Sequence, residues 1–321
     1  MTCLKCQHGN AVKAGTTKNK TPRFRCKACG AKFIEPKAKP LGRHYTSLED
    51  AERVLALLVE GVSIRAITRL TGLNKGTILS LLLTFGAKCA TLFDERVQGI
   101  KASSIQADEL WTFVQKKQKR LKHDDPAERG DQYVWVALDT DSKLVVTYHV
   151  GKRQREQTGI FIEDLRRRLV GAPQITTDGW EAYPAAIDYS FARDVHYATL
   201  IKQYAPANTD GPDWFRPSSR VTGVVKLPLI GRPAEDRICT SHVERANLTF
   251  RMHTRRLTRL TNGFSKKLVN LQAAIAIFMA YYNFCRVHQT LRVTPAMEAG
   301  LTDRVWTLAD LLTMETARKA A

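Results

Sequence analysis

Apolar residues between positions 47 and 86 recur with the 3.6-residue period of an amphipathic α-helix. Ser47 is a suitable N-cap at the start of this region, and Gly61 interrupts the pattern after the first periodic run. The tight turn Thr71-Gly72-Leu73-Asn74 interrupts it again. The pattern therefore predicts three short helices, over about 47–61, 63–70 and 75–85.

A helix, a tight turn and a second helix predict a helix-turn-helix unit, in which the helix after the turn enters the major groove of DNA. The first residues of that helix then face base edges, which nominates Lys75, Thr77 and Ser80 as DNA contacts. The alternative is an ordinary three-helix bundle that does not touch DNA.

Beyond residue 103 the pattern changes to the two-residue alternation of β-strands, with helical runs between them. The predicted strands are 105–114, 133–139, 144–150, 174–177 and 194–197. The predicted helices are 154–169, 179–187, 241–260, 264–285 and a short one near 307–318. This order indicates a mixed α/β domain. The segment 205–240 is rich in Pro, Gly and basic residues, and we expect it to be functional or to become ordered on binding.

The most apolar stretch, Leu268 to Cys285, is interrupted by three side-chain amides and flanked by basic residues. A membrane span needs about 20 nearly uninterrupted apolar residues, so we expect a buried helix here. The N-terminal sequence MTCLKCQHGN has no apolar run of signal-peptide length. We therefore expect a cytosolic protein with no membrane partner.

Four of the seven cysteines are crowded into the first 30 residues as two CxxC pairs, 19 residues apart. Two such pairs present four thiolates to one tetrahedral Zn²⁺, and in a reducing compartment this spacing favours a structural zinc site over a disulfide. A pair of reactive thiols is the alternative. The expected zinc ligands are Cys3, Cys6, Cys26 and Cys29.

The charge of the chain is a second indication of nucleic-acid binding, beside the predicted helix-turn-helix. The 321-residue chain has 50 Lys and Arg against 31 Asp and Glu, a formal charge of +19, while its apolar content of 44% is that of a globular protein and excludes a disordered chain. Residues 1–45 carry eight Lys and three Arg against a single Glu, a net charge of +10. A basic protein gains affinity for nucleic acid by releasing condensed counterions, so double-stranded DNA is the expected partner.

Arg23 and Arg25, between the two CxxC pairs, are candidate DNA contacts. The alternative is that a small zinc module is basic only because it cannot bury charge. After this ribbon, two prolines and a glycine over 36–42 indicate a linker. The predicted organisation is a zinc ribbon at 1–35, a linker at 36–45, a helix-turn-helix domain at 46–100, an α/β catalytic domain at 101–290 with an insertion near 199–240, and a helical tail at 291–321.

Three carboxylates stand at the edges of predicted elements. Asp108 interrupts the first strand, Asp178 ends the strand 174–177, and Glu244 opens a long basic helix. Hard Mg²⁺ prefers oxygen ligands, and two Mg²⁺ ions about 3.5–4 Å apart can activate a water and stabilise the leaving oxygen in phosphodiester cleavage. The structural alternatives are a strand-end residue, a helix cap and a first-turn acid. Glu109, on the opposite face of the strand, is the direct rival of Asp108.

The order of elements resembles that of a ribonuclease-H-like domain, a mixed sheet with flanking helices in which the first and fourth strands are neighbours. Asp108 and Asp178 would then meet, and Glu244 would approach from the side. No Gly-rich phosphate loop is present, so we expect no nucleotide cofactor. No Ser or Tyr stands in a recombinase-like setting, so water or a DNA 3′-hydroxyl is the expected attacking group.

Basic residues follow Glu244 along the same predicted helix. Arg251 lies two helical turns after Glu244 on nearly the same face, where it would hold a DNA phosphate. Arg255 and Arg259 continue the row. His242 is expected either to support the metal ligands or to make an ordinary polar contact.

Motifs over nearly the whole chain resemble the DDE transposases of the insertion-sequence-one type. The resemblance rests on the CxxC knuckles, the helix-turn-helix, Ala-Asp108-Glu-Leu-Trp, Thr-Asp178-Gly-Trp-Glu-Ala-Tyr-Pro and His242-Val-Glu244-Arg-Ala-Asn-Leu-Thr-Phe-Arg251. The basic tract 255–267 and the segment 282–295 are similar to segments of such recombinases.

The resemblance implies metal-dependent cleavage at the ends of a mobile element and joining of the freed 3′-hydroxyls to target DNA, usually within a homodimer or larger multimer. Asp108, Asp178 and Glu244 would be the catalytic residues that hold two Mg²⁺ ions, for which Mn²⁺ substitutes. Two alternatives share the same residues. One is a DNA-binding regulator derived from a transposase that has lost activity, and the other is a nuclease that cuts without joining.

Overall fold

The computed structural model describes residues 1–18, 20–34, 41–42, 44–205 and 221–313. The chain divides into two compact units, Met1–Arg43 and His44–Ala321. Most of the predicted linker 36–45, the middle of the predicted insertion 199–240, and the end of the predicted helix 307–318 lie outside the described residues.

The small unit is a three-stranded antiparallel sheet with very little apolar core. Its strands are β1 (Ala11–Thr16), β2 (Pro22–Cys26) and β3 (Lys32–Ile34). Phe24 and Phe33 face each other across β2 and β3 with ring centroids 6.1 Å apart, but among the described residues of 1–34 the buried apolar side chains are those of Cys3 and Cys26. So small a core cannot hold the sheet together by itself, so the cysteines must contribute to its stability.

The larger unit begins with the three predicted helices. They are α1 (Leu48–Val59), α2 (Ile64–Thr71) and α3 (Lys75–Arg96). The side chains of Ser47, Ser63 and Asn74 each accept a hydrogen bond from a backbone N–H in the first turn of the helix that follows. Gly72 ends α2 with a positive φ of 72°, a conformation that glycine adopts without strain. The existence of the three helices is confirmed.

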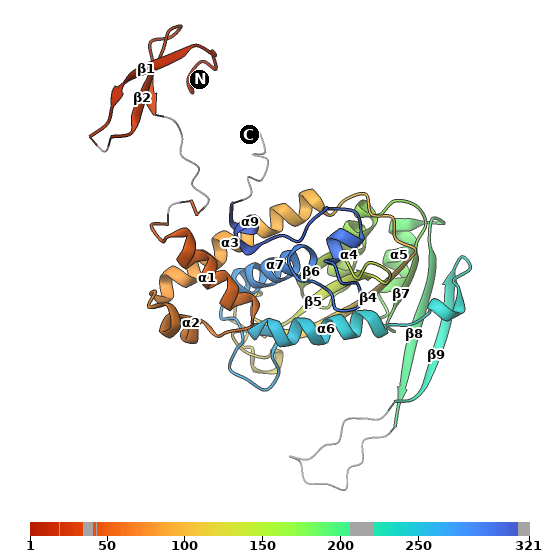
Figure 1. Cartoon of the computed structure of the whole chain (residues 1–321). Helices are drawn as coiled ribbons and strands as arrows, with labels where there is room; N and C mark the ends of the chain where they lie inside the picture. The colour runs from red at the N-terminus through yellow and green to blue at the C-terminus, as the bar shows by residue number, and fades with distance from the viewer. Residues whose placement is uncertain (19, 35–40, 43, 206–220, 314–321) are drawn as a thin grey trace. The chain divides into compact units, whose positions relative to one another are not determined.

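Helix α3 continues to Arg96, past the predicted end near residue 85, because it packs along α7 (Leu268–Phe284). The two helices lie side by side in Figure 1. At Gly86 they approach so closely that a Cβ atom there would lie 2.4 Å from the Cβ of Ala273. Gly86 is therefore a packing residue inside a long helix, and the three helices share one core with the rest of the unit.

Helix α7 confirms the buried helix predicted over the apolar stretch. Among the described helices, α3 is long and apolar enough to cross a membrane by length and composition alone, and 44% of its most apolar window is buried inside the protein.

A six-stranded mixed sheet forms the centre of the unit, in the order β6-β5-β4-β7-β8-β9. Strands β4, β5 and β6 pair antiparallel, β7 pairs parallel with β4, and β8 pairs parallel with β7. This order is compatible with the predicted ribonuclease-H-like sheet and confirms that the first and fourth strands are neighbours. The strands are β4 (Ser104–Val114), β5 (Gly130–Asp139), β6 (Val145–Gly151), β7 (Gln174–Thr177), β8 (His196–Tyr204) and β9 (Val221–Ile230).

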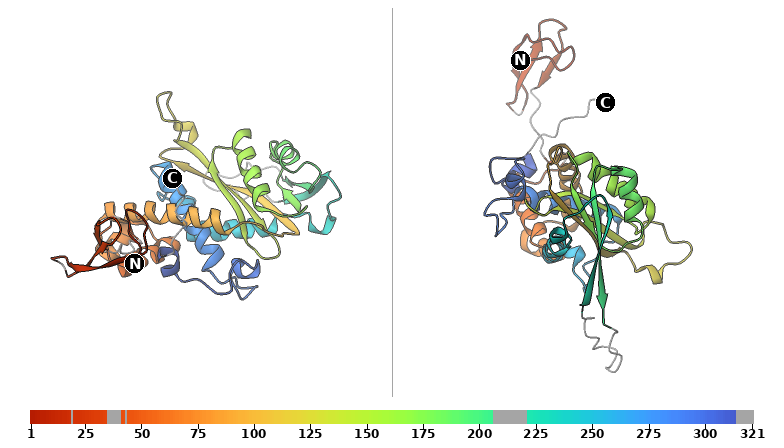
Figure 2. Two further views of the ribbon diagram at one scale, coloured as in Figure 1. Left: turned by 90° about the horizontal axis from the view of Figure 1, so that it is seen from above. Right: turned by 90° about the vertical axis from the view of Figure 1, so that its right-hand side faces the viewer.

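Strand β9 lies within the segment 205–240, where the sequence pattern predicted no strand. It pairs antiparallel with β8, which runs seven residues beyond the predicted end at residue 197. Both strands extend out of the body of the unit as a two-stranded ribbon (Figure 2). Side chains of β9 are exposed or half-buried on both faces of the strand. Because neither face packs against a core, the sequence lacks the apolar–polar alternation by which a strand is predicted.

Helices cover both faces of the sheet. On one face, Trp135 of β5 packs against Phe161 of α4 (Arg155–Arg168) and Tyr183 of α5 (Tyr183–Phe191). On the other face, Asp108 contacts Asn247 of α6 (Ser241–His253), and the backbone of Val145 contacts Asn283 of α7. The remaining described elements are short: α8 (Pro295–Glu298), α9 (Leu308–Thr313) and the 3₁₀ turns Gln118–Arg120, Glu235–Arg237 and Arg255–Leu257.

Predicted boundaries of α5 and α6 were also wrong. Helix α5 begins at Tyr183 instead of residue 179, because the Asp178 side chain caps a turn at Trp180 before the helix starts. Helix α6 ends at His253 instead of residue 260, because the backbone becomes extended at the buried Thr254 (φ −113°, ψ 100°).

Substituting Gly86→Ala should destabilise the protein by about 1–3 kcal/mol, because the added methyl group forces α3 and α7 apart. Gly159→Ala in α4 is the matched control, since a Cβ there meets no atom within 4 Å, and it should stabilise by about 0.5–1 kcal/mol. Urea unfolding of both variants measures this. Equal effects would show that the helix contact at Gly86 is not tight.

Candidate functional site

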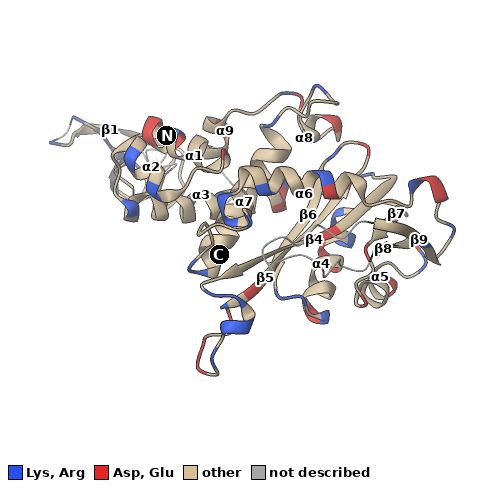
Figure 3. Cartoon of the chain, turned by 90° about the horizontal axis from the view of Figure 1, so that it is seen from below, with Lys and Arg blue, Asp and Glu red and all other residues tan. Residues whose placement is uncertain are grey.

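Parallel pairing of β4 with β7 brings the two predicted aspartates together. Ala107 is aligned with Thr177 in the register, so Asp108 lies level with Asp178, which directly follows the end of β7. One carboxylate oxygen from each of Asp108, Glu109 and Asp178 lies within 4.8 Å of the other two. Figure 3 shows acidic residues in the middle of β4, within the sheet. The expected meeting of Asp108 and Asp178 is confirmed.

Glu109 joins this acidic cluster instead of replacing Asp108 in it. Its side chain is only 3% exposed, and Oε1 has no hydrogen-bond partner among the described residues. Because β7 ends at Thr177, Asp178 is not confined to one face of the sheet and is within reach of both β4 carboxylates. The two-residue period of a strand places Asp108 and Glu109 on opposite faces of the sheet. They belong to one cluster because the neighbouring strand β7 ends at this level.

Arg153 is the counter-charge of the cluster, and no pattern in the sequence distinguished it from other basic residues. Its Nη2 lies 3.3 Å from Oε2 of Glu109 and 3.5 Å from Oδ2 of Asp178. The guanidinium stacks over the ring of Trp180 at 4.3 Å. Trp180 is itself fixed, because its Nε1 donates to Oγ1 of Thr158 (3.1 Å) and its backbone N–H donates to Oδ1 of Asp178 (3.0 Å).

Burial and repulsion raise the pKa of two members of the acidic cluster. Burial, together with the charges of Asp178 and Glu244, raises the pKa of Asp108 to about 6. Burial and the charge of Asp178 raise the pKa of Glu109 to about 8, although Arg153 opposes the shift. A divalent cation among these oxygens would relieve the repulsion, and an all-oxygen donor set is the one that Mg²⁺ prefers. The cluster therefore fits a magnesium site.

Glu244 lies beside the cluster and is not one of its three members. It stands in the first turn of α6, where Oε1 accepts hydrogen bonds from Oγ1 of Thr240 (2.5 Å) and from Nζ of Lys202. Its side chain is 41% exposed. Its effect on the pKa of Asp108 shows that the two carboxylates are neighbours. Its role as the third metal ligand stays a prediction.

Two side chains that sequence reasoning missed connect α6 to β4. Gln106, fully buried, accepts hydrogen bonds through Oε1 from the backbone N–H groups of His242 (2.9 Å) and Val243 (3.1 Å). Asn247 donates from Nδ2 to Oδ2 of Asp108 (2.7 Å). These contacts fix the start of α6, and hence Glu244, relative to the strand that carries Asp108. A buried Gln inside an apolar strand was the signal available in the sequence.

The other residues predicted around α6 do not form the single row along one helix that the sequence predicted. His242 lies 3.2 Å from Nζ of Lys143 through its Nδ1, with no contact to a described carboxylate. Arg251 is half-buried close enough to Asp108 to feel its charge, and its Nε has no hydrogen-bond partner among the described residues. Because α6 ends at His253, Arg255 and Arg259 do not continue the helix, which corrects the predicted row.

The four predicted zinc ligands converge in the small unit. Their sulfur atoms all lie within 4.8 Å of one another, with Sγ of Cys3 and Cys29 3.6 Å apart and Sγ of Cys6 and Cys26 3.6 Å apart. A tetrahedral site with Zn–S bonds of about 2.3 Å requires sulfurs about 3.8 Å apart, so the cluster fits zinc. Backbone N–H groups of Cys6 and Lys5 lower the pKa of Cys3 to about 6, whereas the neighbouring sulfur atoms raise the pKa of Cys6 to about 12. The four thiols therefore do not all ionise readily together without a cation among them.

A residue with a left-handed backbone follows each CxxC pair and turns the chain. It is Gln7 (φ 56°) after the first pair and Gly30 (φ 71°) after the second. Arg23 and Arg25 are exposed on β2. In the larger unit Lys75 and Ser80 are exposed on α3, whereas Thr77 is half-buried.

Without divalent cation, Glu109→Gln should stabilise the protein at pH 8 by roughly 1–3 kcal/mol and have little effect at pH 5. The pKa of Glu109 is about 8 in the folded protein against an ordinary 4.5. The stability that its protonated form contributes to the wild type is therefore fully present below pH 4.5 and is lost as the pH rises to 8. Urea unfolding at both pH values tests this, with the exposed Glu163→Gln as control. An equal difference at both pH values would refute the assignment.

Replacing Cys26 and Cys29 by Ser should release one zinc per chain and unfold the small unit, because metal binding supplies most of the folding free energy of so small a module. Elemental analysis of purified protein measures the metal. Cys285→Ser, in α7's C-cap of the larger unit, should leave the zinc content unchanged. Retention of zinc by the double variant would mean that these thiols do not hold it.

Comparisons with known proteins add little to what the residues themselves indicate. No protein-family model matches the chain, and no curated protein matches it. Among solved structures, a piggyBac transposase synaptic complex with hairpin DNA is similar with a TM-score of 0.35 and 11% identity, over 84% of this chain and 72% of that chain. A Mos1 transposase paired-end complex with the left transposon end has a TM-score of 0.17 and 14% identity, over 50% of this chain and 60% of that one. Similarities of this size are too weak to establish a shared fold.

Proposed function

We propose that the protein is a DDE-type DNA transposase, similar to the insertion-sequence-one type, that binds the ends of its mobile element and catalyses phosphodiester hydrolysis and strand transfer. The observation that carries the proposal is the acidic cluster of Asp108, Glu109 and Asp178 at the adjoining positions of β4 and β7, with α6 beside it. Three mutually repelling carboxylates at this place in a mixed sheet have little structural purpose, since two of them are hard to ionise without a cation.

In this proposal Asp108, Asp178 and Glu244 hold two Mg²⁺ ions, with Mn²⁺ as an accepted substitute. When bound, such ions activate the attacking oxygen and stabilise the leaving oxygen of an in-line displacement. The protein's own contribution is orientation. Asn247 fixes one oxygen of Asp108, and the backbone N–H of Trp180 fixes one oxygen of Asp178. Glu244 would have to give up its contacts with Lys202 and Thr240 to reach the same space, a rotation that its exposed position permits.

Arginines next to the cluster suit the negative charge of a DNA strand. Arg251 has a buried Nε without a hydrogen-bond partner among the described residues and lies near Asp108. A phosphate beside the carboxylates would satisfy that donor. Arg153, which already contacts Glu109 and Asp178, would limit the repulsion between the phosphate and the acidic cluster.

The remaining modules complete the proposal. A zinc ribbon with Arg23 and Arg25 on its surface and a helix-turn-helix made of α2 and α3 would bind the element's ends. The protein would act on DNA in the cytosol as a homodimer or larger multimer, because two ends must be joined to one target. No nucleotide cofactor is part of the proposal.

Asp178→Asn should reduce Mg²⁺-dependent cleavage and joining to below about one thousandth of wild type while leaving DNA binding nearly unchanged. A plasmid carrying the DNA that flanks the gene is the substrate, and gel analysis resolves nicked, cut and joined products. The exposed Asp188→Asn on α5 is the matched control and should behave as wild type. Undiminished cleavage by Asp178→Asn would remove the site from the reaction.

The same assay separates the alternatives. Joined products made by wild type support a transposase, breakage without joining supports a nuclease, and binding without breakage supports a regulator. Comparing Glu244→Gln with Glu109→Gln then identifies the third ligand, because the proposal requires loss of cleavage in the first variant and retention in the second.

A further inference from the structure

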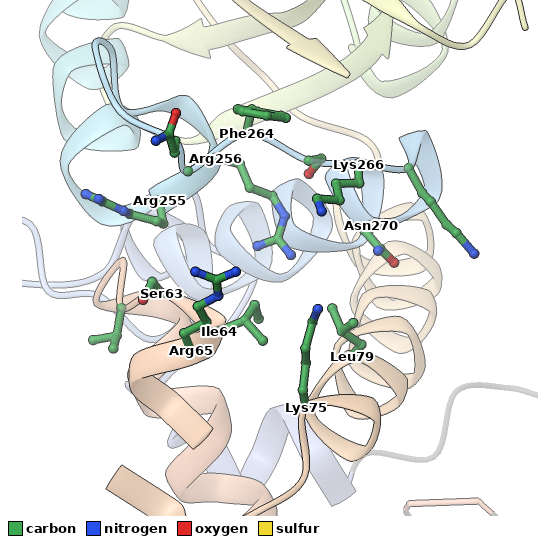
Figure 4. A pocket seen from close by; sticks show the side chains of 15 residues that line it. Ser63, Ile64, Arg65, Lys75, Leu79, Arg255, Arg256, Phe264, Lys266 and Asn270 are labelled. Carbon is green, nitrogen blue, oxygen red and sulfur yellow. The ribbon is translucent and has the colours of Figure 1, made fainter. Parts of the chain in front are cut away.

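A groove of about 640 Å³ lies between the starts of α2 and α3 on one side and the segment from Arg255 to Asn270 on the other. Figure 4 shows Arg65 and Lys75 directed from α2 and α3 toward Arg256 and Lys266 on the opposite wall. No Asp or Glu is found among the described residues that line it. The lining cations are Arg65, Lys75, Arg255, Arg256, Lys266 and Lys267.

These six cations lack counter-charges within the protein. None of them has a carboxylate within 4.0 Å in the described part of the chain. Arg256 is the least solvated of them, since burial lowers its pKa to about 10 and its Nε is buried without a hydrogen-bond partner. Gathering like charges around a partly desolvated guanidinium is unfavourable unless an anion binds among them.

Two helix N-termini add to the positive potential. Helix α2 begins at Ile64 after Ser63, and helix α3 begins at Lys75, and all three residues line the groove. The first N–H groups and the macrodipole of a helix favour an anion at this end. Asn262 and Asn270 offer amide donors on the opposite wall. Side-chain cations, helix termini and amides thus converge on one space from two parts of the chain far apart in sequence.

We propose that this groove binds consecutive phosphates of a DNA backbone, so that one strand contacts the helix-turn-helix and the basic segment 255–267 together. The proposal rests on the proposed function, that the protein acts on DNA. Six cations exceed what a single phosphate requires, and apolar Ile64, Leu79 and Phe264 between them suit the sugars of a continuous strand. Lys75 then contacts phosphate instead of a base edge, which changes its predicted role.

The consequence is a fixed distance between recognition and cleavage. The same basic segment follows α6, whose first turn carries Glu244 and whose Asn247 contacts Asp108. A strand held in the groove would therefore have its register set relative to the acidic cluster by the protein's own core, without a flexible connection between α3 and the sheet.

The test is a triple variant, Arg65→Gln, Lys75→Gln and Lys266→Gln, which leaves the half-buried Arg256 in place. The matched control neutralises three exposed cations outside the groove, Lys101, Arg193 and Arg232. Affinity for duplex DNA of the flanking sequence is measured at 50 and 200 mM salt. Removing one cation that binds a phosphate should shrink the affinity change over this range by about 3.5-fold, so the triple variant should show a markedly flatter salt dependence than the control.

Equal salt dependence in the triple variant and the control would overturn the proposal, even if the wild type cuts and joins DNA. Competition by millimolar inorganic phosphate against wild-type protein gives a second measurement. Phosphate binding that the triple variant loses, with DNA affinity unchanged, would mean that the groove takes a free anion and would also overturn the proposal. Failure of the wild type to bind any DNA would instead contradict the proposed function.

Discussion

The pairing of β4 with β7 is the interaction on which the candidate site depends. Four backbone register pairs align the two strands, and the last of them places Asp108 level with Asp178. The cost is the approach of three carboxylates in a partly dry environment, which raises the pKa of Asp108 and of Glu109. The sheet can maintain this arrangement because its core is extensive on both faces, with Trp135, Phe161 and Tyr183 on one side and Phe250 and Phe278 on the other.

Helix α6 is tied to that pairing by polar contacts instead of apolar packing alone. Gln106 of β4 accepts hydrogen bonds from the first N–H groups of the helix, and Asn247, one turn later in the helix, donates to Asp108 of β4. A displacement of the strand would therefore move the helix and Glu244 with it. Removing Gln106 would leave the buried N–H of Val243 and the partly buried N–H of His242 without this partner, which costs more than the loss of an exposed hydrogen bond.

The helices α1 to α3 belong to the same folded unit as the sheet. Gly86 permits contact of α3 with Ala273 of α7, and Gly61 permits contact of the end of α1 with the end of α6, where a Cβ atom would lie 2.9 Å from the carbonyl oxygen of Met252. Neither glycine marks a domain boundary. The basic groove is a product of this union, because its two walls come from the helical region and from the segment after α6.

Local sequence patterns determined which elements form and which residues are chemically suitable. Caps at Ser47, Ser63 and Asn74, the CxxC pairs, and acids at strand or helix ends depend on neighbouring residues and were predictable for that reason. Tertiary structure alone decided the membership of Glu109 in the acidic cluster, the counter-charge at Arg153, the end of α6 at His253 and the pairing of the exposed strand β9. Each of these depends on where a second element ends or packs, and contacts between residues distant in sequence leave no periodic signal in either segment.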